Sequence, residues 1–97
     1  RRMFALPVGD ISWIEGASQY SRVHAKSGEF LLSRSLASLE CELDPARFFR
    51  IHRSAIVNVK KVKELHPHSN GEYFLVLEGG FELKLSRSYK EVVARFI

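Results

Sequence analysis

The chain has 97 residues, 45% hydrophobic and 11% aromatic, which suffices for one modest core and argues against disorder or several domains. A domain of this size buries only about two thirds of the surface that its unfolded chain exposes, so binding through a surface is favoured over catalysis in an enclosed cavity. The formal net charge of +4, from 15 Lys and Arg against 11 Asp and Glu, suits a polyanionic partner such as nucleic acid or an anionic lipid surface, although many basic surfaces are merely soluble.

The first half of the chain predicts a hairpin followed by a short helix. Residues 20–26 alternate large polar or aromatic side chains with small or apolar ones, and a turn at Ser27-Gly28 leads into a strand over residues 29–33. Leucines then recur at helical spacing over residues 35–43, behind a serine cap and before Asp44-Pro45.

The second half of the chain predicts two further strand pairs. Residues 48–59 are apolar with interspersed basic groups and are rich in β-branched side chains, which favours a strand, a turn and a strand. Residues 73–77 and 81–85 flank Gly79-Gly80, and the strong alternation in the last segment indicates a second hairpin.

The C-terminal residues predict a second helix. The segment from Ser88 to Glu91 has the pattern of a capping box, and an apolar stripe follows at helical spacing. The stripe consists of Tyr89, Val92, Val93 and Phe96. These elements together predict a mainly β domain with two peripheral helices.

Cysteine and histidine usage argues against a disulfide, a metal site or a reactive thiol. The single cysteine, Cys41, is interpreted as a small packing residue, because its neighbours Glu40 and Glu42 disfavour a reactive thiolate. The tripeptide His66-Pro67-His68 has no third ligand nearby in sequence and is interpreted as a polar turn. No catalytic or cofactor-binding motif occurs, so we expect neither enzyme activity nor a cofactor.

Location and domain organisation follow from the same features. No stretch approaches the roughly 18 apolar residues that a membrane helix needs, and Pro7 interrupts the start of the chain before a secretory apolar region forms. We therefore expect a cytoplasmic domain without membrane contact. Because the chain starts without Met and reaches an apolar pattern almost at once, we expect residues 1–97 to be a single domain of a longer protein.

Basic residues at three turns or element ends are the strongest functional signal in the residues themselves. Arg87 precedes Ser88, the predicted N-cap of the last helix, where free backbone N–H groups attract phosphate. Arg22 follows Tyr20 and Ser21 at a predicted strand start, and Arg53 lies in an apolar run where an unpaired arginine should point outward. Three separate loops that each carry an arginine are typical of a protein that contacts a DNA groove through loops.

The run FRIHRSAIVN over residues 49–58 closely resembles the signature of LytTR-type DNA-binding domains, the output modules of many bacterial response regulators. The segments ISWIEG over 11–16 and YSRVH over 20–24 resemble the family's opening strand and loop. SLASLE over 35–40 resembles its helix, and LSRSY over 85–89 its closing turn. The resemblance covers nearly the whole chain in the right order.

This resemblance implies an elongated stack of small antiparallel sheets, with DNA contacted by loops in successive major grooves instead of by a recognition helix. The family's DNA-contacting positions correspond to Ser21 with Arg22, to Arg53 and to Arg87. Some members carry His at the position of Ser21 and Asn at the position of Arg53, so the recognised bases are expected to differ, since arginine favours guanine and asparagine favours adenine.

We therefore hypothesise sequence-specific double-stranded DNA binding by a bacterial transcriptional regulator, as a monomer in solution that pairs on tandem sites. We predict that Arg22, Arg53 and Arg87 contact the bases. The remaining predicted site residues are Tyr20, Ser21, Lys61, Ser86 and Ser88, with the serines and lysine on phosphates. Two roles are equally consistent with Lys60, Lys61 and Lys63: contact with the phosphate backbone, or keeping an edge strand soluble.

Structural roles are expected for the other conspicuous residues in and near these segments. His52 is expected to form a hydrogen bond within the fold and to stabilise the loop that carries Arg53. Phe48, Phe49, Trp13 and Phe81 are expected in the core. The alternatives are a single-stranded nucleic-acid module that stacks bases on Tyr20, Tyr73 and Phe74, and a protein-interaction domain.

Overall fold

The structure of the chain is a computed structural model that describes residues 6–96. In this range the protein forms a five-stranded antiparallel sheet, with strand order β3-β2-β1-β5-β4, and a three-stranded antiparallel sheet, with order β6-β7-β8. The strands are β1 (Ile11–Ala17), β2 (Tyr20–Ala25), β3 (Gly28–Leu32), β4 (Phe48–His52), β5 (Ala55–Asn58), β6 (Val62–Pro67), β7 (Tyr73–Leu77) and β8 (Glu82–Leu85). The helical segments are η1 (Val8–Asp10), α1 (Leu36–Glu42), η2 (Val59–Lys61), η3 (Ser69–Gly71) and η4 (Arg87–Phe96).

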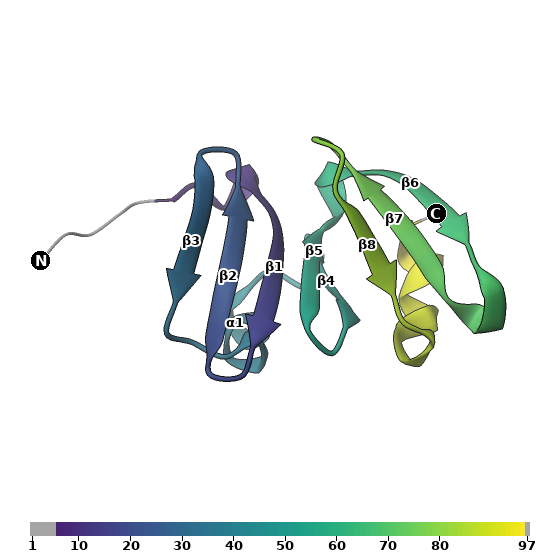
Figure 1. Cartoon of the computed structure of the whole chain (residues 1–97), viewed down its shortest axis with the longest axis horizontal. Helices are drawn as coiled ribbons and strands as arrows, with labels where there is room; N and C mark the ends of the chain where they lie inside the picture. Colours follow the sequence, from purple (N-terminus) through teal and green to yellow (C-terminus); the bar gives the residue numbers. More distant parts are fainter. Residues whose placement is uncertain (1–5, 97) are drawn as a thin grey trace, which may run out of the picture.

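The two sheets lie side by side along an elongated molecule of 47 × 25 × 20 Å. The strands run across the long axis, so their ends form two long edges (Figure 1). One edge, here called the arginine edge, carries the loops over residues 18–19, 33–35, 53–54 and 86–88, and it is the lower edge in Figure 1. The opposite edge carries η1, η2 and the loops after β2 and β7. The predicted mainly β fold with an elongated stack of small sheets is confirmed.

A first apolar cluster joins the two sheets. Strand alternation directs Phe49 and Val57 from the large sheet toward Leu75, Leu77 and Leu85 of the small sheet, and all five are buried. The apolar stripe of η4 packs against this cluster, as its helical spacing predicts. The relative position of the two sheets is therefore fixed by side chains that both sheets bury.

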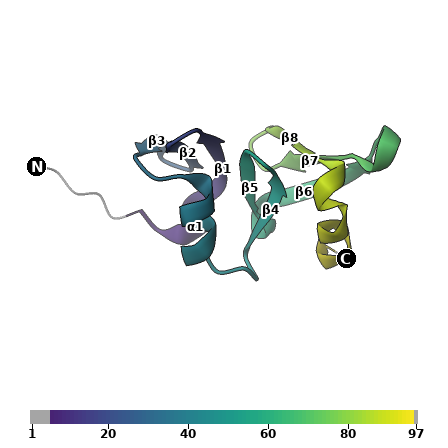
Figure 2. The same ribbon diagram turned by 90° about the horizontal axis from the view of Figure 1, so that it is seen from below.

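A second cluster lies between the large sheet and α1, which is on the same side of the sheets as η4 (Figure 2). The predicted helix is confirmed: Ser35 caps it by accepting a hydrogen bond from the backbone N–H of Ser38 at 3.2 Å, and Leu36 and Leu39 are buried. The helix approaches β1 closely at Gly16, where a Cβ would come within 3.0 Å of the Leu36 Cβ.

The C-terminal segment differs from the prediction. It is a 3₁₀ helix that begins at Arg87, and Ser88 lies inside it, so the predicted capping box is wrong. The Tyr89 N–H donates to the Ser86 carbonyl at 2.9 Å, which closes a three-residue turn directly after β8 and leaves no extended residue to act as an N-cap at position 88.

Aromatic residues are placed in the core with one exception. Phe48 and Phe49 are buried and Trp13 is partly buried, but Phe81 is 41% exposed, so the prediction for Phe81 is wrong. Gly79 and Gly80 adopt positive φ angles and end the turn one residue before β8 begins, which leaves Phe81 outside the strand. Its ring lies edge-on against the rings of Trp13 and His24, at centroid distances of 6.2 and 5.7 Å.

Candidate nucleic-acid interface

The β4–β5 turn presents Arg53 at the arginine edge. Arg53 is exposed, and within residues 6–96 its guanidinium forms no hydrogen bond or ion pair. The Nδ1 atom of His52 accepts a hydrogen bond from the Ser54 N–H at 3.1 Å and lies 2.9 Å from the Ser54 hydroxyl. The predicted structural role of His52 is confirmed, because this ring closes the turn from which Arg53 projects.

Arg50 is a residue of this turn that the sequence analysis missed. Its Nε donates to the carbonyl of His52 at 2.8 Å, and its Nη2 donates to the carbonyl of Arg53 at 2.5 Å. Its Nη1 donates to Glu40 of α1 at 2.5 Å. The available signal was strand alternation, which places Arg50 beside Ile56 on the helix-facing side of the sheet, where an arginine needs partners.

A hollow of about 340 Å³ lies beside this turn at the arginine edge. The backbone N–H of Gly16 donates to the Ser54 carbonyl at 2.8 Å, which joins β1 to the turn at this place. The lining residues are Gly16, Ala17, Ser18, Ser35, Leu36, Ala37, Arg50, Arg53 and Ser54. This lining is called here the serine-arginine hollow. It contains three hydroxyls, the guanidinium of Arg53 and that of Arg50, which is already bound to Glu40. The exposed guanidinium of Arg53 beside the three hydroxyls suits a phosphate or a base edge.

Arg87 lies farther along the same edge, at the start of η4. Its side chain passes over Gly71, where a Cβ would come within 3.1 Å of the Arg87 Cγ. Arg87 is exposed and, in the part of the chain that the structure describes, its guanidinium forms no hydrogen bond or ion pair. Of the two neighbouring serines predicted to hold phosphates, Ser88 is exposed and Ser86 is half-buried.

The pKa of the Glu72 carboxyl near this arginine is lowered. The largest cause is the hydrogen bond from Lys84, whose Nζ lies 2.8 Å from Oε2; burial raises the pKa, and the charges of Lys84, His68 and Arg87 lower it further. Glu72 is therefore stabilised in its ionised form beside the arginine edge, and Lys84 is its main charged partner.

Arg22 differs from Arg53 and Arg87. It lies within β2 and not at a strand end, and its Nη1 is 3.2 Å from Glu29 while its Nε is 3.8 Å from Glu15. Half of its side chain is exposed, at 49%. The prediction that Arg22 projects freely from a loop is therefore wrong: cross-strand pairing places it between two carboxylates on a sheet face.

Ser21 does not present a hydroxyl at the surface. It is fully buried on the helix-facing side of β2, and its Oγ donates to the Arg34 carbonyl at 2.7 Å. The prediction of an aromatic, a hydroxyl and an arginine presented together is thus wrong, because successive strand residues point to opposite faces. Tyr20 is half-exposed at the start of β2, beside the loop over residues 18–19.

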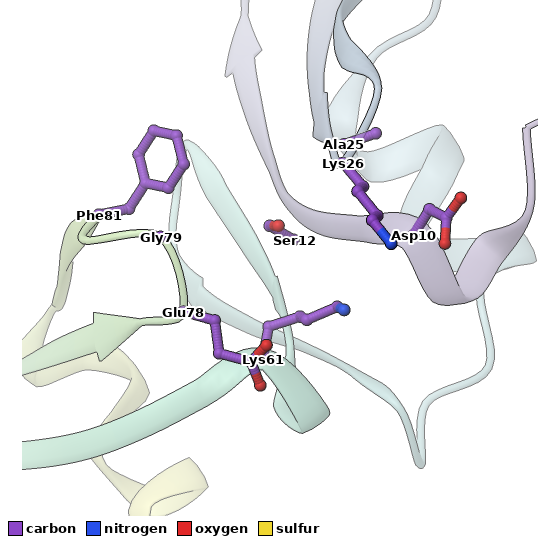
Figure 3. A pocket seen from close by; sticks show the side chains of 8 residues that line it. All are labelled: Asp10, Ser12, Ala25, Lys26, Lys61, Glu78, Gly79 and Phe81. Carbon is purple, nitrogen blue, oxygen red and sulfur yellow. The ribbon is translucent and has the colours of Figure 1, made fainter.

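Lys61 lies on the opposite edge, in η2, away from Arg53 and Arg87 (Figure 1). It lines a second hollow, drawn in Figure 3, together with Lys26, Asp10 and Glu78. The two lysines and two carboxylates cancel in formal charge. Lys61 was predicted to hold phosphate or to keep an edge strand soluble. Its position in η2 places it on the edge opposite Arg53 and Arg87 (Figure 1), and a sequence alone does not show which edge η2 occupies.

Other groups singled out in the sequence have ordinary surroundings. Cys41 is exposed on α1, so its prediction as a packing residue is wrong. The Nε2 of His66 lies 2.6 Å from Glu64, and the His68 ring packs edge-on against Phe74. Residues 6–96 contain no group of three or more His, Cys, Asp or Glu side chains that could hold a metal ion. No helix in that same range has the length and apolar character needed to cross a membrane.

A mainly β domain of two small antiparallel sheets that presents exposed arginines along one edge has the basic surface that is typical of nucleic-acid-binding domains. The chain matches the family model of the LytTr DNA-binding domain over residues 1–97 and belongs to this family. It is thus a DNA-binding domain and not an enzyme, and the predicted resemblance is confirmed.

Individual relatives support this assignment. Transcriptional regulatory protein YpdB of Escherichia coli strain K12 is 32% identical over 88 residues, which cover 90% of this chain and 36% of YpdB. Transcriptional regulatory protein LytR of Staphylococcus aureus strain MW2 is 34% identical over 67 residues, 69% of this chain and 27% of LytR. The chain thus spans about a third of the length of these curated relatives.

A solved structure agrees in fold. The LytTr DNA-binding domain of a putative methyl-accepting/DNA response regulator from Bacillus cereus superposes with a TM-score of 0.86 at 26% sequence identity. The match covers 94% of this chain and 84% of the solved chain. The predicted fold class is therefore also that of a solved member of the family.

Proposed function

We propose that this domain binds specific double-stranded DNA sequences through the loops of its arginine edge, inserted into successive major grooves. Arg53 and Arg87 contact bases, and the hydroxyls of Ser18, Ser35 and Ser88 contact phosphates. The observation that carries this proposal is the serine-arginine hollow, which presents Arg53 beside three hydroxyls. An arginine fork matches the two major-groove acceptors of guanine, and hydroxyls suit phosphate oxygens.

The order of the loops along the arginine edge supports contact with more than one groove. The loop over residues 18–19 belongs to the large sheet and Arg87 follows the last strand of the small sheet, with the turn of Arg53 between them (Figure 1). The Ser86 N–H donates to the Ile51 carbonyl at 2.9 Å, so Arg53 and Arg87 are near neighbours and face the same stretch of duplex. Contact with the next groove therefore comes from the loops at the far end of the large sheet.

Arg22 has a secondary role in this proposal. Its guanidinium is half-exposed and already has two carboxylate neighbours, so it contacts a phosphate only by leaving Glu29 or Glu15. Tyr20 lies beside the loop over residues 18–19 and packs against the sugar-phosphate backbone. Lys61, on the opposite edge, has no part in the contact.

The wider role follows from the relatives, whose names describe transcriptional regulation. We propose that the domain is the output part of a longer, cytoplasmic bacterial regulator, and that it is monomeric alone and pairs on tandem sites. The single-stranded alternative loses support because Tyr73 packs against the inter-sheet cluster and Phe74 is half-buried.

Selection from a randomised duplex pool tests the proposal. We expect the domain to enrich one motif, and we expect the enriched duplex to bind more tightly than its separated strands or a scrambled duplex. Enrichment of no motif, or equal affinity for the single strands, would contradict sequence-specific duplex binding.

A further inference from the structure

The guanidinium of Arg50 donates hydrogen bonds to two carbonyls of the β4–β5 turn. Nε donates to His52 and Nη2 donates to Arg53, at 2.8 and 2.5 Å. The side chain is mostly buried, with 16% exposed. An arginine at this exposure whose three guanidinium nitrogens each donate to an acceptor is held in one conformation, because rotation would leave polar groups of the turn without partners.

This turn needs such a partner because the strand pairing is irregular there. The register between β4 and β5 shifts between Arg50 and His52, which is the mark of a bulge. A bulge takes carbonyl groups out of the regular ladder of hydrogen bonds. Arg50 donates to two carbonyls at this irregular end, so the backbone that carries Arg53 is held by a side chain as well as by the sheet.

The third donor of Arg50 connects the turn to α1. Nη1 lies 2.5 Å from Oε1 of Glu40, on the helix that packs against the opposite side of the hollow. Glu40 is itself half-exposed, at 46%. The turn is therefore fixed relative to the helix as well as within its own hairpin.

We infer that Arg50 is a positioning residue for DNA recognition: it aims Arg53 at the bases without contacting them, by holding the carbonyls of His52 and Arg53 against Glu40. This inference rests on the proposed contact of Arg53 with DNA. Lysine does not replace Arg50 in this role, because a single ammonium group has no planar fork to reach two carbonyls and a carboxylate together.

A double-mutant cycle on the selected duplex tests the inference. The variants are Arg50→Lys, Arg53→Ala and their combination, and the readout is the ratio of affinities for the selected and a scrambled duplex. We expect Arg50→Lys to lower this ratio about tenfold in the wild-type background and less than about twofold when Arg53 is already alanine, because residues that act through one contact are not additive.

Arg95→Lys is the matched control. Arg95 also donates to a backbone carbonyl, that of Pro45 at 2.8 Å, and its guanidinium lies 4.0 Å above the ring of Phe49 on β4. Arg95→Lys removes the guanidinium from the ring of Phe49 and so disturbs packing beside the same strand, without a contact to the turn. We expect it to leave the affinity ratio unchanged, even where the thermal midpoint falls as much as in Arg50→Lys.

The outcomes separate the inference from the function on which it rests. An equal loss on Arg50→Lys in both backgrounds would mean that Arg50 contacts DNA itself, and the inference would be overturned. An unchanged ratio on Arg53→Ala alone would refute the base contact of Arg53 instead. Should Arg50→Lys not fold, Glu40→Gln decides: it retains Arg50, and a ratio that stays at the wild-type value in Glu40→Gln would overturn the inference.

Discussion

The backbone N–H of Ser86 donates to the carbonyl of Ile51 at 2.9 Å, and this hydrogen bond joins the end of β8 to β4. Ile51 lies two residues before Arg53, and Ser86 lies directly before Arg87. The bond therefore ties together the segments that carry Arg53 and Arg87. Because Ile51 is fully buried in the apolar cluster between the sheets, the backbone spacing of the two loops is fixed before DNA binds.

Arg53→Ala and Arg87→Ala should each cost about 1–3 kcal/mol of binding free energy on the selected duplex and relax the base preference at one position. The physical reason is the loss of a two-pronged contact to guanine. Titration of the selected duplex and its single-base variants measures both effects. Unchanged preference in both variants would contradict the base contacts.

Lys61→Ala should leave duplex affinity and its salt dependence unchanged, because Lys61 lies on the opposite edge beside Glu78. Arg87→Ala is the comparison and should reduce the slope of log affinity against log salt by about one, as expected for one lost ionic contact. A slope that falls equally in both variants would show that DNA also reaches the opposite edge.

Glu29→Gln should strengthen duplex binding by about two- to fivefold at low salt, since it frees Arg22 from its shorter carboxylate contact of 3.2 Å. Glu64→Gln removes the same charge elsewhere, from a pair with His66, and serves as the control. If the two variants gain equally, the effect is one of net charge and Arg22 takes no part in binding.

Gly16→Ala should destabilise the domain by about 1–3 kcal/mol, because its Cβ would meet the buried Leu36 Cβ at 3.0 Å. Gly9→Ala, where a Cβ would have no heavy atom within 4 Å, should have little effect. Urea unfolding of both variants measures the difference. Equal stability would mean that α1 shifts away from β1 without cost.

Acid should remove a stabilising contribution of Glu72. Its pKa is below the ordinary value of 4.5 in the folded protein, chiefly because of the hydrogen bond from Lys84, so folding is favoured while the group is ionised. The contribution is present above pH 4.5 and is lost as the pH falls through the lowered folded value.

Unfolding midpoints measured from pH 7 down to pH 3 test this dependence. Glu72→Gln should flatten the acid side of the curve, because glutamine does not titrate. Parallel acid curves for wild type and Glu72→Gln would contradict the assignment.

Local sequence patterns predicted the helices and strands well where apolar residues followed one clear helical or strand period. The serine cap and leucine spacing of α1, and the alternation that buries Leu83 and Leu85, depend only on near neighbours. Phe81 continues the same alternation but lies outside β8, because the two glycines of the turn determine where the strand begins. Patterns of this kind therefore predict strands better than they predict strand ends.

The candidate site was predicted only where the arginine lies in a turn. Arg53 lies in the turn between β4 and β5, and its guanidinium has no ion-pair partner among residues 6–96. Its place between two apolar runs indicated an outward position. The environment of Arg22 depends on which residues of β1 and β3 pair with β2, and that register brings Glu15 and Glu29 to it from different strands. Pairing of this kind is not visible in a single sequence.

The strands run across the long axis of the molecule (Figure 1), and this direction separates the loops from the core. Each loop of the arginine edge connects the ends of a different pair of elements, while the buried side chains lie within the sheets. A substitution at Arg53 or Arg87 therefore leaves the pleated scaffold intact. In the proposed binding mode, base preference therefore changes by replacement of one loop residue at a time, while the packed sheets stay the same.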